Sequence, residues 1–488
     1  MSGRHTIRGD RPPTPDPGVK PAVSGPDGSS SIAVDESDAG QVGGHPPGSS
    51  RAWGIASWIA TAVLGRVVSA IVPLALIPVT LAYLGPDLYG LWMAVIALTG
   101  MAAFADLGLG NGLLTRLAPC CASGDDHLGR RYVSSAYAMV SAIALAGCAV
   151  LWLGAGLVPW RAVFNAPDSI SPADARALTL TCLTAFLLNM PLSLVNRVQF
   201  AYRMGARSNL WQAAGSASSL PLALGAVHAE LPAAVVVAAA VTGPVLVNLV
   251  NTCWTFGRRL PGLAPTWGAL DPATGRGLLR ISGLFGVVTV LMTVADNADS
   301  LIIAHTRGLS EVTAYAVPAR LFTQLGVIVM LVNQPFWPAH GEALAAGRVT
   351  WVRRTARRMT LVSTAIVLLP AAALVLWGEW LFTTWLPVPL LGDRWLLPGL
   401  AAWWLIVAAT SPVFMVQNAA GVVRPQLVGY AAYLGLSLVG KWYGATHFGI
   451  SAVPYVGAAC YLLTVVPAAL HGYRRALTAH ASAPTVER

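Results

Sequence analysis

Apolar stretches of about twenty residues follow one another from Trp53 onward, and short polar segments separate them. A helix needs about 20 apolar residues to cross the hydrocarbon core of a bilayer. The pattern therefore predicts an all-α, polytopic membrane protein with about 12 transmembrane helices. The twelve predicted spans are 57–82, 89–113, 132–157, 177–196, 208–228, 232–256, 281–306, 312–337, 359–378, 396–420, 425–443 and 452–472.

The basic residues between these spans are distributed unevenly. If the N-terminus lies inside, the inner segments hold 24 Lys and Arg residues. The outer segments hold five, namely Arg161, Arg176, Arg307, Arg394 and Lys441. Because basic loops are retained on the cytoplasmic side, we expect a multi-pass protein of the cell inner (plasma) membrane with both termini cytoplasmic.

The longest inner connection between spans is 257–280, which divides the twelve spans into six and six. We therefore predict an N-lobe over 53–256, a cytoplasmic inter-lobe linker over 257–280, and a C-lobe over 281–475. A cytoplasmic tail over 476–488 would follow. Because six is an even number, both lobes would have the same orientation in the membrane, as in transporter repeats related by an axis along the membrane normal.

A short internal similarity falls at matching places in the two halves. The first two spans turn at YLGPDLYGLW, and the seventh and eighth turn at HTRGLSEVTAYAV. In each turn a glycine is followed by an acidic residue, and then by a tyrosine that opens the next span. The match is short, but its position is the one that two repeated lobes would give.

The N-terminal segment differs from the rest of the chain. Residues 1–50 contain no aromatic residue, and 17 of the 50 are Pro or Gly. Such a segment cannot bury enough apolar surface to offset its chain entropy. We predict that 1–52 is a disordered cytoplasmic tail, and it has no apolar run of the kind a signal peptide needs.

The overall composition agrees with a membrane protein. Hydrophobic residues make up 55% of the chain and charged residues only 11%, with a mean hydropathy of +0.61. Soluble domains average about 25% charged residues. The formal charge of +10 is therefore interpreted as a topology signal, and we expect no nucleic acid partner. The expected partners are membrane lipids and a transported substrate, and the expected state is a monomer.

Cysteine usage indicates neither a disulfide framework nor a metal site. Four of the six cysteines fall in apolar spans, where a thiol behaves as a small hydrophobe. The other two, Cys120 and Cys121, are adjacent and match no metal-ligand spacing. We expect no metal and no cofactor.

Charged residues inside the seventh and eighth spans are the main candidates for chemistry. Asp296, Asn297 and Asp299 lie in the seventh span, and Arg320 lies in the eighth. Asp296 and Asp299 are three residues apart and so share a helix face. Counting about 1.5 Å per residue places both carboxylates and Arg320 at matching depth on neighbouring helices.

The first two spans carry a related pair. Arg66 lies to the cytoplasmic side of the first span's midpoint, and Asp106 lies at a similar depth in the second. A charged side chain near the bilayer centre costs about 3 kcal/mol, so it normally faces a partner or a water-filled cavity.

Two interpretations of these charges remain open. They are paired ions that fix the register of the helices, or they line a hydrated central cavity. In a cavity, an arginine would hold an anionic group such as phosphate through its forked donors, and a carboxylate would carry a coupling proton. The excess of carboxylates, two Asp to one Arg in the second half, favours the cavity.

Four motifs, at the spans where such exporters carry them, give a resemblance to a known family. They are LAYLGPDLYGLW with FADLGLGNGLLTRLA, NRVQFAYRMG, DNADSLIIAHTRGLSEVTAYAVPARLF and QPFWPAHGEALAAGRVTWVRR. The chain resembles the Wzx-like polysaccharide and lipopolysaccharide biosynthesis exporters (flippases) of the multidrug/oligosaccharidyl-lipid/polysaccharide exporter superfamily. The resemblance covers residues from about 50 to 475 and implies a MATE-like fold.

The resemblance also implies a function. The chain would flip or export a polyprenyl-linked oligosaccharide across the inner membrane by alternating access, with H+ or Na+ as coupling ion. Arg66, Arg320 and Asn297 are then the candidate substrate-binding residues. The candidate ion-coupling residues are Asp106, Asp296 and Asp299.

Three alternatives stay beside this interpretation. A drug/cation antiporter of the same superfamily would share the fold and use carboxylates for its coupling ion. A membrane glycan polymerase or ligase needs catalytic groups on a substantial outer loop, and the outer loops here are short. A scaffold that transports nothing would not need charges within its spans. We therefore expect a transporter and not an enzyme.

Overall fold

The structure is a computed structural model that describes residues 48–102, 109–389 and 392–481. The chain divides into two compact units, Met1–Gly54 and Ile55–Arg488. Of the first unit, only residues 48–54 fall within the described part, where they begin the first helix. The predicted disorder of 1–52 therefore lies almost wholly outside the described residues.

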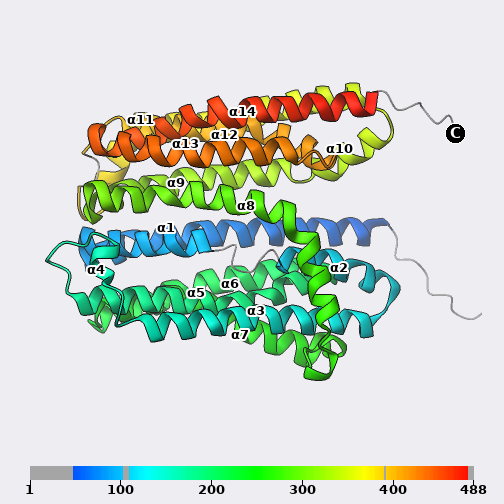
Figure 1. Ribbon diagram of the computed structural model, residues 1–488, viewed down its shortest axis with the longest axis horizontal. Helices are drawn as coiled ribbons and strands as arrows, with labels where there is room; N and C mark the ends of the chain where they lie inside the picture. Colours follow the sequence, from blue (N-terminus) through cyan, green and yellow to red (C-terminus); the bar gives the residue numbers. More distant parts are fainter. Residues whose placement is uncertain (1–47, 103–108, 390–391, 482–488) are drawn as a thin grey trace, which may run out of the picture. The chain divides into compact units, whose positions relative to one another are not determined.

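All regular secondary structure in the described ranges is helical, which confirms the all-α prediction (Figure 1). The long helices are α1 (Gly48–Met101), α2 (Leu109–Ser123), α3 (Asp126–Gly154), α5 (Pro172–Ala201), α6 (Gly205–His228), α7 (Ala233–Trp254), α8 (Pro272–Arg307), α9 (Leu309–Asn333), α10 (Phe336–Ala345), α11 (Val349–Trp385), α12 (Leu396–Ala419), α13 (Arg424–Phe448) and α14 (Ala452–Ala481). Short turns are α4 (Trp160–Val163), η3 (Thr255–Arg259), η4 (Pro261–Leu263) and η5 (Trp267–Ala269).

A helix coincides with each predicted span, with one difference in the first hairpin. The first two predicted spans are joined in α1, which contains a break at Gly85, where φ is 72°. Within the described residues, nine helical stretches are long and apolar enough to cross a membrane. The protein is therefore a multi-pass membrane protein.

Polar residues and glycines set several helix ends. Ser171 accepts a hydrogen bond from the backbone N–H of Asp174 at the start of α5, and Asp125 accepts one from Leu128 at the start of α3. Such caps satisfy N–H groups that have no partner inside the helix. Gly308 lies between α8 and α9 with φ at 96°, a conformation that side chains other than glycine rarely adopt.

The helices pack mainly on neighbours from the same half of the chain. Helix α5 contacts α2, α3, α6 and α7, while α12 contacts α9, α11 and α14 (Figure 1). Helix α8 packs on α9 and α13, and also touches α2 and α3 of the first half. This arrangement agrees with the predicted lobes, whose boundaries stay a prediction.

The connection 257–280, predicted as a linker, is held against α3. Arg130 Nε donates to the carbonyl of Gly262 at 2.5 Å, and Arg131 Nη2 lies 2.7 Å from Asp271 Oδ2. Asp271 also caps α8. Hydrogen bonds from the Thr274 hydroxyl first, and then from backbone N–H groups, hold the pKa of Asp271 below its usual value, and nearby Arg131 adds to this.

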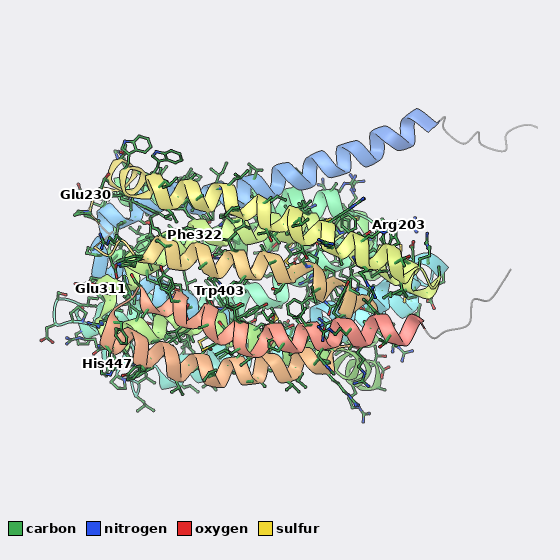
Figure 2. All side chains as sticks on the ribbon, turned by 90° about the horizontal axis from the view of Figure 1, so that it is seen from above. Arg203, Glu230, Glu311, Phe322, Trp403 and His447 are labelled. Atoms are coloured by element: carbon green, nitrogen blue, oxygen red, sulfur yellow. The ribbon has the colours of Figure 1, made fainter. Side chains whose placement is uncertain are left out.

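The helix ends alternate between two sides of the bundle. Figure 2 shows Glu230, Glu311 and His447 at one end and Arg203 at the other. We call these the Glu311 end and the Arg203 end. This grouping is the one expected when successive helices cross a membrane in opposite directions.

The two turns that resemble each other in sequence lie against each other at the Glu311 end. Thr313 Oγ1 donates to the carbonyl of Pro86 at 2.6 Å. A Cβ atom added to Gly90 would lie only 1.9 Å from the carbonyl oxygen of Leu309. Backbones can approach this closely only where a side chain is missing, so glycine closes this end of the bundle.

Candidate functional site

A cavity of about 410 Å³ lies among six helices, within the size range of small-molecule sites. Its lining combines charged, polar and aromatic side chains. They come from α1 (Met93, Ile96, Ala97), α8 (Met292, Asp296, Asn297, Asp299, Ser300), α9 (Tyr315, Ala316, Ala319, Arg320, Thr323), α12 (Leu400, Trp403, Trp404, Val407), α13 (Tyr430, Lys441) and α14 (Tyr461).

Helical spacing explains how α8 and α9 present their polar residues to this cavity. On α8, Met292, Asp296 and Ser300 recur every four residues, and on α9, Ala316 and Arg320 do the same. Residues four apart lie on one face of a helix. The sequence prediction that the two carboxylates and Arg320 lie at matching depth on neighbouring helices agrees with this shared lining.

Asp299 is held by two partners from other parts of the chain. Lys441 Nζ on α13 lies 2.6 Å from Asp299 Oδ1, and the hydroxyl of Tyr315 donates to Asp299 Oδ2 at 2.6 Å. The side chains of Lys441 and Asp299 are 4% and 14% exposed. Two charges removed from water in this way stabilise each other only when geometry and hydrogen bonds are good, as they are here.

Lys441 is the candidate site residue that sequence reasoning missed. The distribution of basic residues predicted that Lys441 lies in an outer segment. That prediction is wrong, because Lys441 is buried against the cavity. Its ammonium lies 6.0 Å from the ring centre of Trp403 and 5.8 Å from that of Tyr433. A signal was present, since Lys441 is the only lysine after Lys20 in a chain that otherwise uses arginine.

Asp296 faces the cavity as an exposed side chain. Within the described residues it lies in no ion pair and takes part in no side-chain hydrogen bond, whereas Asp299 has both. The two carboxylates, treated alike in the sequence, therefore have different environments. Asp299 is a fixed partner of Lys441, and Asp296 is open to whatever enters the cavity.

Arg320 lines the same cavity from α9 and is partly buried. Its Nη1 lies 3.6 Å from the sulfur of Met93, and its guanidinium is next to Tyr89. No carboxylate in the described part of the chain lies within 4.0 Å of it. Asp299 thus forms an ion pair with Lys441 and not with Arg320, and no ion pair in the described part of the chain includes Arg320.

Asn297 connects the cavity wall to α1. Its Nδ2 donates to the carbonyl of Thr293 at 2.8 Å, one turn earlier in α8. A Cβ atom on Gly100 of α1 would lie 2.4 Å from Asn297 Oδ1, so the missing side chain makes room for the amide.

Aromatic rings form the wall of the cavity near Lys441. Trp403 stacks on Tyr433 with ring centres 6.0 Å apart and meets Tyr461 edge to face at 5.3 Å. Tyr430 and Tyr461 bring their hydroxyls within 3.4 Å. Offset and edge-to-face contacts of this kind hold aromatic side chains in fixed orientations.

Two predicted residues cannot be placed. The side chain of Arg66 and the whole of Asp106 lie outside the described residues. Among the described residues, no group of three or more His, Cys, Asp or Glu side chains could hold a metal ion.

Two known protein families match this chain. The family described as "Polysaccharide biosynthesis protein" matches residues 56–340, which is more than half of the chain. The family described as "MatE" matches residues 285–423, a range that includes most of the cavity lining on α8, α9 and α12. No curated protein matched.

Solved structures show the same fold at low sequence identity. An inward-facing multidrug resistance MATE family transporter of the MOP superfamily has a TM-score of 0.68 and 16% identity, over 87% of this chain and 96% of that chain. A mutant Vibrio cholerae MATE transporter has 0.61 and 16%, over 87% and 98%. A MOP superfamily transporter from Pyrococcus furiosus, described as having a binding pocket of reversed polarity, has 0.60 and 16%, over 88% and 94%.

These matches agree with the geometry of a cavity lined by charges and aromatic rings among transmembrane helices. They confirm the resemblance drawn from the motifs. The protein is a multi-pass membrane protein with the fold of MOP-superfamily transporters. The chain belongs to the polysaccharide biosynthesis protein family.

Proposed function

We propose that this protein carries a lipid-linked glycan with a phosphate or pyrophosphate linkage across the inner membrane, by alternating access. The family match supports a glycan as the cargo. The cavity supports an anionic, ring-containing ligand, because it combines Arg320 with aromatic walls and hydrogen-bonding side chains.

The availability of Arg320 is the observation that carries the proposal. Its guanidinium lines the cavity, where Nη1 lies 3.6 Å from the Met93 sulfur, and it is next to the Tyr89 hydroxyl. A guanidinium has five N–H donors in a planar fork that matches phosphate geometry. No carboxylate in the described ranges lies within 4.0 Å of this fork, so most of its donors are available to a ligand. A charged residue within the membrane is expensive unless it has such a role.

The charges around the cavity support coupling to protons. Asp296 and Asp299 balance Arg320 and Lys441, so the four groups together are neutral when all are ionised. A phosphate bound at Arg320 adds negative charge close to Asp296. Protonation of Asp296 would offset that charge, so substrate and proton would enter the cavity together.

The aromatic wall suits the sugar part of the substrate. Trp403, Trp404 and Tyr461 offer large apolar faces, and Asn297 and Ser300 offer hydrogen-bonding groups nearby. Sugar rings have apolar C–H faces and polar hydroxyl rims. Sites that combine flat apolar surfaces with a few placed polar groups provide both contacts.

We also propose that the Glu311 end is periplasmic and the Arg203 end cytoplasmic, which follows from the distribution of basic residues. The close contacts between Pro86 and Thr313 and between Gly90 and Leu309 then close the outer side. Greater similarity to the inward-facing MATE transporter (TM-score 0.68) than to its outward-facing form (0.62) supports this state. Alternating access would move the N-lobe, 53–256, against the C-lobe, 281–475.

A drug/cation antiporter is the second candidate. The unpaired carboxylate of Asp296 beside Trp403 and Tyr461 is the observation that favours it, because carboxylates and aromatic faces both attract organic cations. The two candidates differ in the sign of the cargo's charge, and so in whether Arg320 or Asp296 contacts it.

A deletion strain distinguishes these functions. Lipid-linked glycan on the cytoplasmic face is measured without the protein and with wild-type, Arg320→Gln or Arg258→Gln. Arg258 is an exposed arginine outside the cavity and serves as the matched control. We expect wild-type and Arg258→Gln to clear the accumulated glycan and Arg320→Gln to leave it. Normal glycan levels with altered sensitivity to cationic drugs would reject the flippase in favour of the antiporter.

A further inference from the structure

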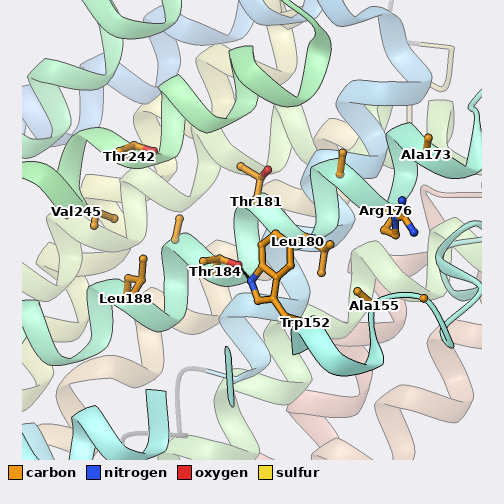
Figure 3. Close-up of a pocket in the computed structure, with 13 residues that line it drawn as sticks. Trp152, Ala155, Ala173, Arg176, Leu180, Thr181, Thr184, Leu188, Thr242 and Val245 are labelled. Atoms are coloured by element: carbon orange, nitrogen blue, oxygen red, sulfur yellow. Dashed lines mark hydrogen bonds between the residues drawn. The ribbon is translucent and has the colours of Figure 1, made fainter. Parts of the chain in front are cut away.

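A second, larger cavity, drawn in Figure 3, has a lining that shares no residue with the cavity around Asp296 and Arg320. Its volume is about 870 Å³, and it forms a groove between α3, α5 and α7. It is lined by Trp152, Ala155, Gly156, Ala173, Arg176, Ala177, Leu180, Thr181, Thr184, Ala185, Leu188, Thr242 and Val245. None of these residues was assigned a role in transport.

The polarity of the lining changes in one direction along α5. Arg176 lies in the second turn of the helix, near the Glu311 end. Thr181 and Thr184 follow at about 8 and 12 Å, and Leu188 follows at about 18 Å from Arg176, counting 1.5 Å per residue. Small residues, Ala177 and Ala185, keep this face of the helix open.

Several polar groups in the groove are available to a ligand. Arg176 is exposed, and no carboxylate in the described ranges lies within 4.0 Å of its guanidinium. Thr181 and Thr242 make no side-chain hydrogen bond within those ranges. Only Thr184 has a partner, since Trp152 Nε1 donates to its hydroxyl at 3.1 Å, as Figure 3 shows.

The order of groups matches one class of molecule. A glycerophospholipid presents a phosphate, then ester carbonyls that accept hydrogen bonds, and then an acyl chain. The groove presents a guanidinium, then hydroxyls that donate, and then the apolar side chains of Leu188 and Val245. A polyprenyl phosphate has a phosphate but no ester carbonyls along its chain, so it leaves the threonine hydroxyls without acceptors.

We propose that this groove binds one anionic glycerophospholipid, with its phosphate on Arg176 and its ester groups near Thr181. One acyl chain lies along Leu188 and Val245. The exposed indole of Trp152 covers the chain where α3 ends. The proposal is independent of the identity of the transported substrate.

Native mass spectrometry of the purified full-length protein tests this site. Phosphatidylglycerol, phosphatidylethanolamine or undecaprenyl phosphate is added to wild-type, Arg176→Gln and Ala185→Trp, the last of which fills the groove. Arg394→Gln is the control, because Arg394 is an exposed arginine outside the groove, stacked on Trp395. Because Arg176→Gln removes a charge-assisted contact to the phosphate, we expect it to lower retention of phosphatidylglycerol about tenfold.

We expect wild-type and Arg394→Gln to retain one phosphatidylglycerol in preference to phosphatidylethanolamine, and both groove variants to lose this preference. Equal retention by all four proteins would overturn the proposal. Displacement of phosphatidylglycerol by equimolar undecaprenyl phosphate would also overturn it, because the groove would then bind polyprenyl lipid. Arg176 is exposed, so its substitution tests the site even where Ala185→Trp does not fold.

Discussion

The ammonium of Lys441 lies 2.6 Å from the carboxylate of Asp299, although 142 residues separate them in the chain. The pair joins α13 to α8 at the wall of the cavity that Arg320 also lines. It neutralises one carboxylate and one ammonium within the membrane. Asp296 and Arg320 also line the cavity, and neither belongs to an ion pair among the described residues.

Loss of one member of this pair is expected to destabilise the protein. Lys441→Met leaves Asp299 buried without its cation. Breaking a buried ion pair in this way lowers the free energy of unfolding by about 3 kcal/mol. The double variant Asp299→Asn with Lys441→Met removes both charges and is expected to recover most of the loss. Thermal unfolding in detergent of the wild-type, both single variants and the double variant measures the coupling. Additive effects of the two substitutions would show that the residues are not coupled.

Asp296 is expected to govern coupling and not folding. Asp296→Asn keeps the shape of the side chain but cannot gain or lose a proton. We expect its transport to become independent of a proton gradient and its melting temperature to stay within a few degrees of wild-type. Transport into proteoliposomes with and without a gradient measures this. Glu379→Gln, an exposed site on α11 outside the cavity, is the control. A gradient dependence unchanged in Asp296→Asn would exclude Asp296 as the coupling group.

Gly90 is expected to control closure of the Glu311 end. A leucine there would place its Cβ 1.9 Å from the carbonyl oxygen of Leu309, and backbone atoms cannot move away as a flexible side chain can. We expect Gly90→Leu to separate α1 from α9. Pulsed electron paramagnetic resonance between spin labels at positions 87 and 310, in a background without native cysteines, measures that separation.

Gly435→Leu is the matched control for this measurement, because nothing lies within 4 Å of a Cβ atom added at Gly435. We expect its label distances to equal those of the unsubstituted protein. If Gly90→Leu gave the same distances as well, the close contact at Gly90 would not hold this end closed.

Asp271 is expected to add a pH-dependent term to stability. Its pKa in the folded protein is lowered by hydrogen bonds from Thr274 and the start of α8, and by nearby Arg131. The stabilisation is therefore fully present when the pH is above the pKa of Asp271 in the unfolded chain, about 3.9. It is lost as the pH falls through the lower pKa of the folded protein. Melting temperatures of wild-type and Asp271→Asn should differ at pH 7 and converge in acid. A difference that stayed constant with pH would contradict this.

Much of the helical architecture follows from the sequence, because apolar length and loop charge are local properties that the membrane enforces. The corresponding positions of the two turns were also indicated in sequence, since Gly85 and Gly308 mark matching places, but their contact with each other was not. The position of the predicted linker 257–280 does not follow from its sequence. Its polar composition indicates a loop, but the ion pair between Arg131 and Asp271 fixes it on α3.

The candidate site was predicted only in part. Spacing predicted that Asp296, Asp299 and Arg320 lie at equal depth on adjacent helices, and all three line one cavity. Spacing could not show that Lys441 reaches Asp299, since α13 is distant in the chain and its approach depends on how the helices pack. The partner of each charge is a property of tertiary structure, and so is the difference between Asp296 and Asp299.

Transport by the purified protein tests the central claim most directly. Lipid-linked glycan from the deletion strain is placed in proteoliposomes, and its exposure to an impermeant glycosidase is followed over time. We predict that wild-type and Arg258→Gln protein expose the glycan quickly, and that Arg320→Gln slows exposure at least about tenfold, as expected for loss of a charge-assisted contact. Exposure by Arg320→Gln at the wild-type rate, or by wild-type at the rate of empty vesicles, would contradict the account.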